Sequence, residues 1–324
     1  MPASSRWIRS VLIGSGSYLP EKILTNRQLA ATLDTTDDWI VQRTGIHQRH
    51  IAAESETTID LAVAAAEQAL VSAGLQSAAE VDLVIVATTT PTDVFPATAT
   101  AVQHRLGTAG FAFDLQAVCS GFVYGLTVAD SLLQSGSAKT ALVIGAEKFS
   151  NLLDWSDRGS CVLFGDGAGA VVLRAEAGSG ELSDRGILST FLHSDGAFRD
   201  ILYTDGAPGA KVKMVGKEVF RHATEKMAAV AEEALDSLGL TGADLDWLVP
   251  HQANLRIIEA TAKKLGLPLS KVICTVGTHA NTSAASIPLA LDSGFRQGLL
   301  RPGQLIMVEA LGGGLTWGSA VIRL

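Results

Sequence analysis

Three residues able to take part in catalysis lie far apart in the sequence, each close to the expected end of a strand. The first is Cys119, which follows an apolar segment at 111–115 and precedes a helical pattern at 122–133. Because the N-terminus of a helix favours a negative charge, we expect the thiol pKa to be lowered and the sulfur to be nucleophilic. A cysteine among apolar neighbours is also common as a small core residue, and this interpretation stays open.

The other two residues, His251 and Asn281, carry hydrogen-bond donors. His251 comes directly after the apolar segment 248–250, and a neutral imidazole can donate to an oxygen that becomes negative in a transition state. Asn281 offers an amide donor that does not titrate. Each residue also has a simpler structural interpretation. His251 could be a histidine that is hydrogen-bonded inside a loop, and Asn281 could be the cap of a helix.

A glycine-rich segment near the C-terminus, LGGGLTWG at 311–318, has backbone N–H groups that no side chain can block. Such a turn can supply half of an oxyanion hole, although many glycine-rich turns are only turns. Metal chemistry finds less support, because His47 and His50 lack partner ligands at a suitable spacing.

Composition narrows the classes of protein that fit. The net charge of −8 argues against nucleic-acid binding, and no segment reaches the ~18 apolar residues of a membrane-spanning helix. The apolar stretch after Arg6 and Arg9 is too short for a signal peptide. The three cysteines are widely spaced and do not predict a disulfide framework. We therefore expect a cytoplasmic protein with reduced thiols that binds neither nucleic acid nor a membrane.

The chain also contains an internal duplication. The segment AEQALVSAGL at 66–75 recurs as AEEALDSLGL at 231–240. Each copy has helical spacing, ends near a glycine suited to a left-handed cap, and leads to an apolar strand, at 82–87 and at 246–249. The order of the following segments is also repeated, so that Cys119 and Asn281 occupy corresponding positions.

Those segments predict two similar α/β halves, 1–174 and 175–324, each a parallel sheet covered by helices. In the first half we expect strands at 111–115, 141–145 and 167–173 and a helix at 122–133. In the second half we expect strands at 271–276, 305–308 and 318–324 and a helix at 287–295. A short strand is also expected at 162–164, beside Cys161, and Cys274 falls within the strand at 271–276.

Seven segments in this order resemble the β-ketoacyl-acyl carrier protein synthase III family, and the resemblance covers essentially the whole chain. They are 14–20, 38–46, 118–122, 164–170, 250–256, 281–286 and 312–318. The resemblance implies a thiolase-like, five-layered αβαβα fold and a homodimer. It also implies a condensing enzyme that uses an acyl-CoA as substrate, with no metal and no cofactor.

The implied reaction starts fatty-acid biosynthesis. An acyl group passes from coenzyme A to Cys119, and malonyl-acyl carrier protein then loses carbon dioxide. The resulting enolate attacks the Cys119 thioester and gives 3-ketoacyl-acyl carrier protein. By the same resemblance, His251 and Asn281 donate hydrogen bonds to the malonyl thioester oxygen. The backbone N–H groups of Cys119 and Gly313 form the oxyanion hole.

The resemblance further assigns binding residues. Trp39 and Arg158 enclose the adenine of coenzyme A, with Thr35 and Arg43 nearby, and Phe95 reaches across the dimer to cap the acyl pocket. The residues that line the pantetheine channel are Gly216, Phe220 and Asn254. Those that dock the acidic carrier protein are Arg221, Arg256, Lys263 and Lys264, a set that without the resemblance would be a solvated basic surface.

The sequence departs from the family at Ala280, where glycine is usual, and at Leu311 and Leu315, where phenylalanine is common. Because of these changes, the resemblance does not predict the acyl preference or the decarboxylation rate. The sequence also does not identify the pathway that the enzyme serves. A competing interpretation is a secondary-metabolism relative that transfers the acyl group to another nucleophile without decarboxylation. A non-catalytic acyl-CoA-binding subunit is disfavoured, because Cys119, His251 and Asn281 are all present.

Overall fold

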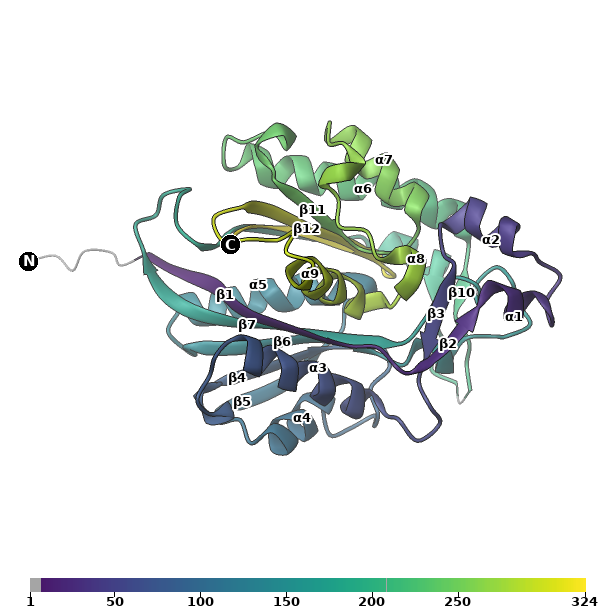
Figure 1. Ribbon diagram of the computed structural model, residues 1–324, viewed down its shortest axis with the longest axis horizontal. Coiled ribbons are helices and arrows are strands. Elements are labelled where there is room, and N and C mark those ends of the chain that lie inside the picture. Colours follow the sequence, from purple (N-terminus) through teal and green to yellow (C-terminus); the bar gives the residue numbers. More distant parts are fainter. Residues whose placement is uncertain (1–6, 208) are drawn as a thin grey trace, which may run out of the picture.

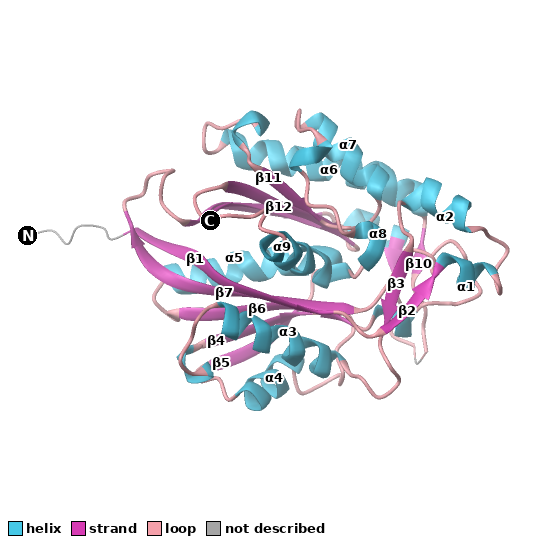
Figure 2. Cartoon of the chain, in the orientation of Figure 1, coloured by secondary structure: helices cyan, strands magenta, loops and turns pink. Residues whose placement is uncertain are grey.

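The computed structural model describes residues 7–207 and 209–324, which form alternating layers of helices and β-sheets (Figure 1). Two helices lie between two sheets, and a further pair of helices covers the outer face of each sheet (Figure 2). Buried apolar side chains fill the space between each pair of neighbouring layers. The arrangement is the expected αβαβα sandwich.

The first sheet has five strands and the second has four. In spatial order the first contains β1 (Trp7–Tyr18), β7 (Gly167–Gly178), β6 (Thr140–Glu147), β4 (Leu83–Ala87) and β5 (Phe111–Leu115). The second contains β11 (Trp247–Pro250), β12 (Leu305–Gly312), β13 (Thr316–Arg323) and β8 (Gly186–Ser194).

Both sheets are mixed, so the expectation of purely parallel sheets is wrong. Strands β5, β4 and β6 run parallel to one another, as do β11 and β12, whereas β1, β7, β13 and β8 pair in antiparallel fashion. The reason is plain at β12 and β13, which are joined by only three residues. So short a connection can join only antiparallel strands, because a parallel pair needs a crossover of a dozen residues or more.

Six helices form the three helical layers. The outer layer of the first sheet contains α3 (Thr58–Ser72) and α4 (Thr98–Leu106). The central layer contains α5 (Gly121–Gln134) and α9 (Ser286–Arg296). The outer layer of the second sheet contains α6 (Gly216–Asp236) and α7 (Leu255–Lys264). The helices of the duplicated segments end as expected, since Gly74 and Gly239 both have a positive φ, of 65° and 67°.

The two sheets repeat one topology. The order β1-β7-β6-β4 corresponds to β8-β13-β12-β11, with the same parallel or antiparallel sense at each pairing. The boundary expected after residue 174 falls inside β7, which extends to Gly178. The division of the chain into two halves stays a prediction.

The expected strand at 271–276 is not formed. Only Val272 pairs with the sheet, through a single parallel bridge to Leu248. At the corresponding place in the first sheet, the full strand β5 pairs with β4. The buried side chain of Gln252 binds the rest of this segment: its Oε1 accepts from the N–H groups of Thr275 and Val276 at 2.8 and 3.0 Å, and its Nε2 donates to Ile273. These bonds replace a strand ladder, so Cys274 lies in irregular chain.

The short strand expected at 162–164 is also absent, because Val162 and Leu163 lie in turns and Phe164 forms only an isolated parallel bridge to Asn281. Leu163 N–H donates to the Ser160 carbonyl, and the buried guanidinium of Arg49 donates to the Val162 carbonyl at 2.7 Å. Arg49 lies on β3 (Gln48–Ile51), which pairs with β2 (Lys22–Thr25).

Several short elements complete the fold and surround the ends of the strands. The remaining helices and strands are α1 (Asn26–Ala30), α2 (Asp37–Thr44), α8 (Val276–His279), β9 (Leu202–Tyr203) and β10 (Lys213–Met214). The 3₁₀ turns are η1 (Ala78–Glu80), η2 (Val118–Ser120), η3 (Phe149–Leu152), η4 (Gly196–Ile201), η5 (Gly242–Asp244), η6 (Leu269–Lys271) and η7 (Ser283–Ala285).

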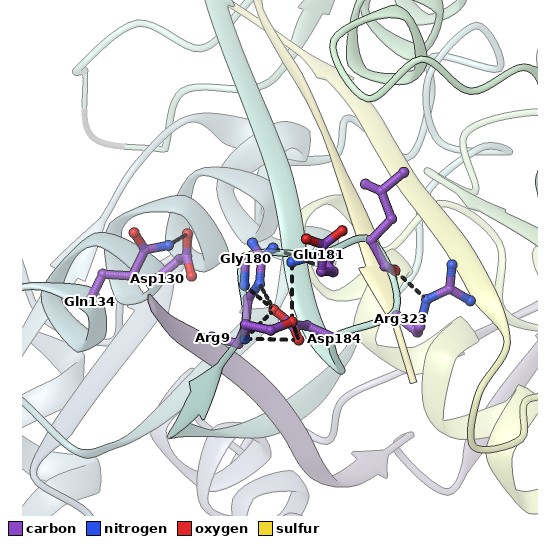
Figure 3. A network of polar contacts seen from close by, with 9 residues as sticks. Arg9, Asp130, Gln134, Gly180, Glu181, Asp184 and Arg323 are labelled. Carbon is purple, nitrogen blue, oxygen red and sulfur yellow. Dashed lines mark hydrogen bonds and ion pairs between the residues drawn. The ribbon is translucent and has the colours of Figure 1, made fainter. Parts of the chain in front are cut away.

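A polar network fixes the connection from β7 to β8, and thereby from the first sheet to the second (Figure 3). The carboxylate of Asp184 accepts from the N–H groups of Ser179 and Gly180 and from the Ser179 hydroxyl, at 2.7–3.0 Å. It also pairs with the guanidinium of Arg9 on β1 at 3.2 Å. These bonds hold the pKa of Asp184 well below its usual range, with the Ser179 bonds as the main cause.

Candidate active site

A cavity of about 520 Å³ runs from the surface near α2, α6 and α7 to the ends of the strands. Cys119, His251 and Asn281 all line it, although they lie up to 162 residues apart in the sequence. The other predicted site residues that line it are Trp39, Arg43, Arg158, Gly216, Phe220, Asn254 and Arg256. Much of the remaining wall is apolar, with Met214, Met227 and Leu311 among its residues.

Cys119 lies in η2, directly before α5, as expected. The turn is fixed on the side of the glycine-rich segment, where the Thr316 hydroxyl donates to the Ala117 carbonyl at 2.9 Å and contacts the Ser120 hydroxyl at 2.7 Å. Val118, immediately before the cysteine, has a φ of 51°, which is unfavourable for a β-branched residue. The backbone around Cys119 is thus held in a strained conformation by its surroundings.

The electrostatic expectation for Cys119 is wrong. Burial raises the pKa of its thiol to about 12, although a nearby Ser283 hydroxyl acts in the opposite direction. The side chain is only 4% exposed, so desolvation of a thiolate outweighs the benefit expected from the helix N-terminus. Burial therefore favours the protonated thiol of Cys119 near neutral pH.

His251 is buried at the end of β11, where its N–H donates to the Glu309 carbonyl of β12 at 2.8 Å. Its ring nitrogen Nδ1 lies 2.6 Å from the hydroxyl of Ser286, the first residue of α9. Nε2 is consequently the ring nitrogen available to the cavity. Burial lowers the pKa of His251 to about 3, so the ring is neutral near pH 7.

Asn281 is held on both sides by backbone hydrogen bonds. Its N–H donates to Leu163 at 2.9 Å, and its carbonyl accepts from Gly165 at 3.0 Å. The side-chain Oδ1 accepts from the N–H of Ser283 at 2.8 Å, which leaves the Nδ2 donor available to the cavity. Asn281 is not the helix cap, because the N-cap residue of η7 is Thr282. Ala280 before it has a φ of 60°.

The glycine-rich turn packs directly against η2. A Cβ atom on Gly312 would lie 2.7 Å from the Cys119 nitrogen, so only glycine permits this approach. Gly313 does not line the first cavity. It lines a second cavity of about 490 Å³, which also includes Cys119 and has Phe149, Phe164 and Leu202 in its wall. Cys119 thus lies where the two cavities meet.

At the mouth of the first cavity, two arginines stack on one indole. The guanidinium carbons of Arg43 and Arg158 lie 4.3 and 5.2 Å from the centroid of Trp39. Arg158 also donates to the backbone carbonyl and to the carboxylate of Asp34. Asn254 donates to the Arg43 carbonyl at 2.9 Å and so joins α7 to α2.

The other predicted binding residues lie outside both cavities. Thr35 is half-buried, and Phe95 is 84% exposed on the loop before α4. Arg221 on α6 and Lys263 and Lys264 on α7 are exposed, and α6 packs beside α7. Together with Arg256 they place four cations on neighbouring helices.

Sequence reasoning assigned no role to four residues around the catalytic side chains: Glu147, Ser283, Ser286 and Thr316. Glu147 ends β6 and is fully buried, and its carboxylate accepts from the Thr89 and Thr90 hydroxyls at 2.8 and 2.6 Å. Burial raises the pKa of both Cys119 and Glu147, and the nearby Ser283 hydroxyl, which has no hydrogen-bond partner among the described residues, acts in the opposite direction on both. Two of the four belong to the segment 281–286, whose run of hydroxyls was the available signal.

Two features of the described residues bear on other classes of function. Within residues 7–207 and 209–324, no three His, Cys, Asp or Glu side chains gather as they would around a metal ion. No helix in that part of the chain is both long enough and apolar enough to cross a membrane.

Comparison with known proteins gives a consistent result. Residues 113–196 match the family described as 3-oxoacyl-[acyl-carrier-protein (ACP)] synthase III, and residues 235–324 match the family described as its C terminal part. The β-ketoacyl-[acyl-carrier-protein] synthase III of Paramagnetospirillum magneticum is 62% identical over 98% of this chain and 99% of its own.

Solved structures agree with the sequence match. The 3-oxoacyl-[acyl-carrier-protein] synthase III of Aquifex aeolicus superposes with a TM-score of 0.92 at 46% identity, over 97% of this chain and all of that one. A priming β-ketosynthase of a polyketide biosynthetic pathway superposes with a TM-score of 0.91 at 35% identity, over 98% and 96% of the two chains. Because the match at 62% identity spans 98% of this chain and 99% of the relative, the chain belongs to the β-ketoacyl-[acyl-carrier-protein] synthase III family.

Proposed function

We propose that this enzyme condenses an acyl-CoA primer with malonyl-acyl carrier protein, with loss of carbon dioxide, and so begins fatty-acid biosynthesis. The observation that carries the proposal is the single cavity in which a buried thiol meets two oriented, uncharged hydrogen-bond donors. Two donors that carry no charge near pH 7 suit an enolate oxygen, which becomes negative only during the reaction.

In the first half-reaction, the Cys119 sulfur attacks the acyl thioester carbon and coenzyme A leaves as its thiol. The thiol proton of Cys119 is transferred to the departing sulfur, so the raised pKa of Cys119 is compatible with the overall proton balance. The backbone N–H groups of Cys119 and Gly313 stabilise the tetrahedral oxyanion. The proposal is supported by the packing of Gly312 against the Cys119 nitrogen.

In the second half-reaction, the bond between the malonyl carboxylate and its α-carbon breaks, and the electron pair forms an enolate on the thioester oxygen. His251 and Asn281 donate hydrogen bonds to that oxygen. The α-carbon then attacks the acyl group on Cys119, carbon dioxide and the 3-ketoacyl thioester are released, and the Cys119 sulfur leaves as a thiolate that takes up a proton from solvent. We expect neither a metal nor a cofactor to be required.

Coenzyme A enters by the Trp39 end of the cavity, with its adenine between Trp39 and Arg158. Arg158 would have to move outward to admit the base, since its guanidinium already stacks on the indole. Thr35 and Arg43 lie beside this site, and Gly216, Phe220 and Asn254 line the channel for pantetheine. The acidic carrier protein docks on Arg221, Arg256, Lys263 and Lys264.

We further propose a cytoplasmic homodimer in which Phe95 caps the acyl pocket of the other subunit. Two features support the dimer. Val94 and Phe95 are 98% and 84% exposed, and β5 is an edge strand that carries the partly exposed Phe111. Exposed apolar side chains beside an unpaired edge are typical of an interface. The three free cysteines fit a reducing compartment.

The test separates the two half-reactions. In His251→Ala and Asn281→Ala, radiolabelled acyl transfer to Cys119 should persist, whereas carbon dioxide release should fall by about 10²–10³-fold, as for the loss of one preorganised donor. Cys119→Ala should abolish acylation and serves as the control. Loss of acylation with intact decarboxylation in His251→Ala would instead make His251 the base that activates Cys119. Acyl transfer to another nucleophile, without a 3-ketoacyl product, would identify the secondary-metabolism alternative.

A further inference from the structure

The hydroxyl of Ser286 contacts the ring nitrogen of His251 that faces away from the cavity. Ser286 is 1% exposed, and its Oγ lies 2.6 Å from His251 Nδ1 and 3.3 Å from the backbone nitrogen of Gln252. All three residues are buried, so solvent does not compete for these groups. The hydroxyl thus bridges the ring of His251 and the chain that follows it.

The proton count of this bridge leaves one consistent arrangement. A serine hydroxyl has a single proton to donate and two lone pairs with which to accept. The Gln252 N–H can only donate, so it uses one lone pair of Oγ. Within the described chain, His251 Nδ1 is the one acceptor at hydrogen-bond distance from Oγ. The hydroxyl proton therefore points at Nδ1, which must be unprotonated.

We infer that Ser286 is a positioning residue that holds His251 as the tautomer with its proton on Nε2. That proton then faces the cavity, where it is available to the substrate oxygen. The inference rests on the proposed function, because it explains why His251 donates a hydrogen bond. It adds a residue and a proton position to that role.

The opposite tautomer would give His251 a different function. With the proton on Nδ1, the ring would donate to Ser286 and present Nε2 to the cavity as an acceptor, which is the arrangement of a general base for Cys119. Both tautomers are uncharged, so the low pKa of His251 does not choose between them. The hydrogen bond from the Ser286 hydroxyl to Nδ1 favours the tautomer with its proton on Nε2, which can donate to the enolate oxygen.

The tautomer can be measured without any reaction. Nitrogen-15 NMR of protein carrying ring-labelled histidine separates a protonated from an unprotonated ring nitrogen, and the His251→Ala spectrum identifies the signal of His251. In the wild-type protein we expect Nε2 protonated and Nδ1 bare. Finding the proton on Nδ1 overturns the inference, whatever the enzyme is then found to catalyse. This readout also decides the matter if a Ser286 variant fails to fold.

Variants connect the tautomer to the reaction. Ser286→Ala should reduce carbon dioxide release by about 10- to 100-fold, the usual effect of removing the partner that orients a functional histidine. Acyl transfer to Cys119 should be nearly unchanged, and Ser286→Thr, which keeps the hydroxyl, should recover most of the rate.

Thr282→Val is the matched control, because the Thr282 hydroxyl is buried in the same turn and has no partner among the described residues. It should leave the His251 signal unchanged. Wild-type decarboxylation in Ser286→Ala, or equal loss of both half-reactions in it, would refute the role of Ser286. A wild-type enzyme that shows the expected tautomer but forms no 3-ketoacyl product would instead refute the proposed function alone.

Discussion

The fully buried carboxyl group of Glu309 should make the stability of this protein fall between pH 5 and pH 7.5. Neither of its oxygens has a hydrogen-bond partner in the described residues, and burial raises its pKa to about 8 from an ordinary value of 4.5. On β12 it points in the same direction as Leu305 and Met307, which pack in the core beneath α6 and α7. Ser319, its partner on β13, donates to the Val230 carbonyl of α6 at 2.9 Å.

The sign and size of the effect follow from the two pKa values. The folded protein keeps the Glu309 proton up to about pH 8, whereas the unfolded chain releases it above 4.5. The stability contribution is therefore fully present below pH 4.5 and is lost as the pH rises through 8. At about 1.4 kcal/mol per unit, the loss between pH 5 and pH 7.5 amounts to about 3 kcal/mol.

Glu309→Gln should remove this dependence, because an amide of the same shape does not titrate. The measurement is the free energy of unfolding in urea at pH 5 and pH 7.5, at one protein concentration, for the wild type and the variant. Relative to the wild type, the variant should gain about 3 kcal/mol between the two pH values. His251 and His279, whose pKa values are lowered to about 3 and about 4, titrate in both proteins and cancel in this difference.

Glu232→Gln on the exposed side of α6 is the matched control and should leave the pH profile parallel to that of the wild type. If Glu309→Gln also gives a parallel profile, the carboxyl group is solvated or paired in solution, and the argument from its burial is wrong.

Three further predictions concern binding and stability. Trp39→Ala should raise KM for acyl-CoA about tenfold with little change in kcat, since a stacked base contributes roughly 1–3 kcal/mol; an unchanged KM would make Trp39 an ordinary packing residue. Charge reversal at Lys263 and Lys264, which lie outside the cavity, should raise KM for malonyl-acyl carrier protein, and the increase should be larger at low salt. The same change should not slow the acylation of Cys119. Asp184→Asn should lower the urea midpoint at pH 7, and this difference from the wild type should become smaller as the pH falls from 3.8 toward the lower folded pKa of Asp184; equal differences at pH 7 and pH 3 would contradict this.

The sequence predicted the elements around the candidate site well where periodicity and duplication were informative. The helix after Cys119 was expected at 122–133 and extends from Gly121 to Gln134, and the strand at 111–115 was predicted without error. The repeated order of elements placed Cys119 and Asn281 in corresponding positions, and both line one cavity. These features depend on neighbours in the sequence, so they are visible in a single chain.

The parts that could not be predicted depend on contacts between distant segments. Residues 271–276 have the composition of a strand, but the side chain of Gln252 takes over their backbone hydrogen bonds. Ser286 lies 35 residues from His251, and nothing in its local sequence shows that it faces the ring. The pKa of Cys119 was predicted in the wrong direction because the helix N-terminus is a local feature, whereas the burial that dominates is contributed by the whole fold.

The duplication extends to the conformation of the backbone beside the reactive groups. Val118 and Ala280, which directly precede Cys119 and Asn281, have φ values of 51° and 60°, and of the described residues other than glycine only Ser283 shares this feature. Each such residue costs on the order of 1–3 kcal/mol and persists only where the surrounding structure imposes it. Thr316 bonds to the backbone beside the first position, and the backbone of Leu163 and Gly165 bonds to the residue after the second, so unrelated segments hold the two sites. A positive φ thus precedes both Cys119 and Asn281, and both of these residues line the same cavity. We interpret the strained residues as the means by which the backbone after β5 and the backbone after α8 direct these two side chains into that cavity.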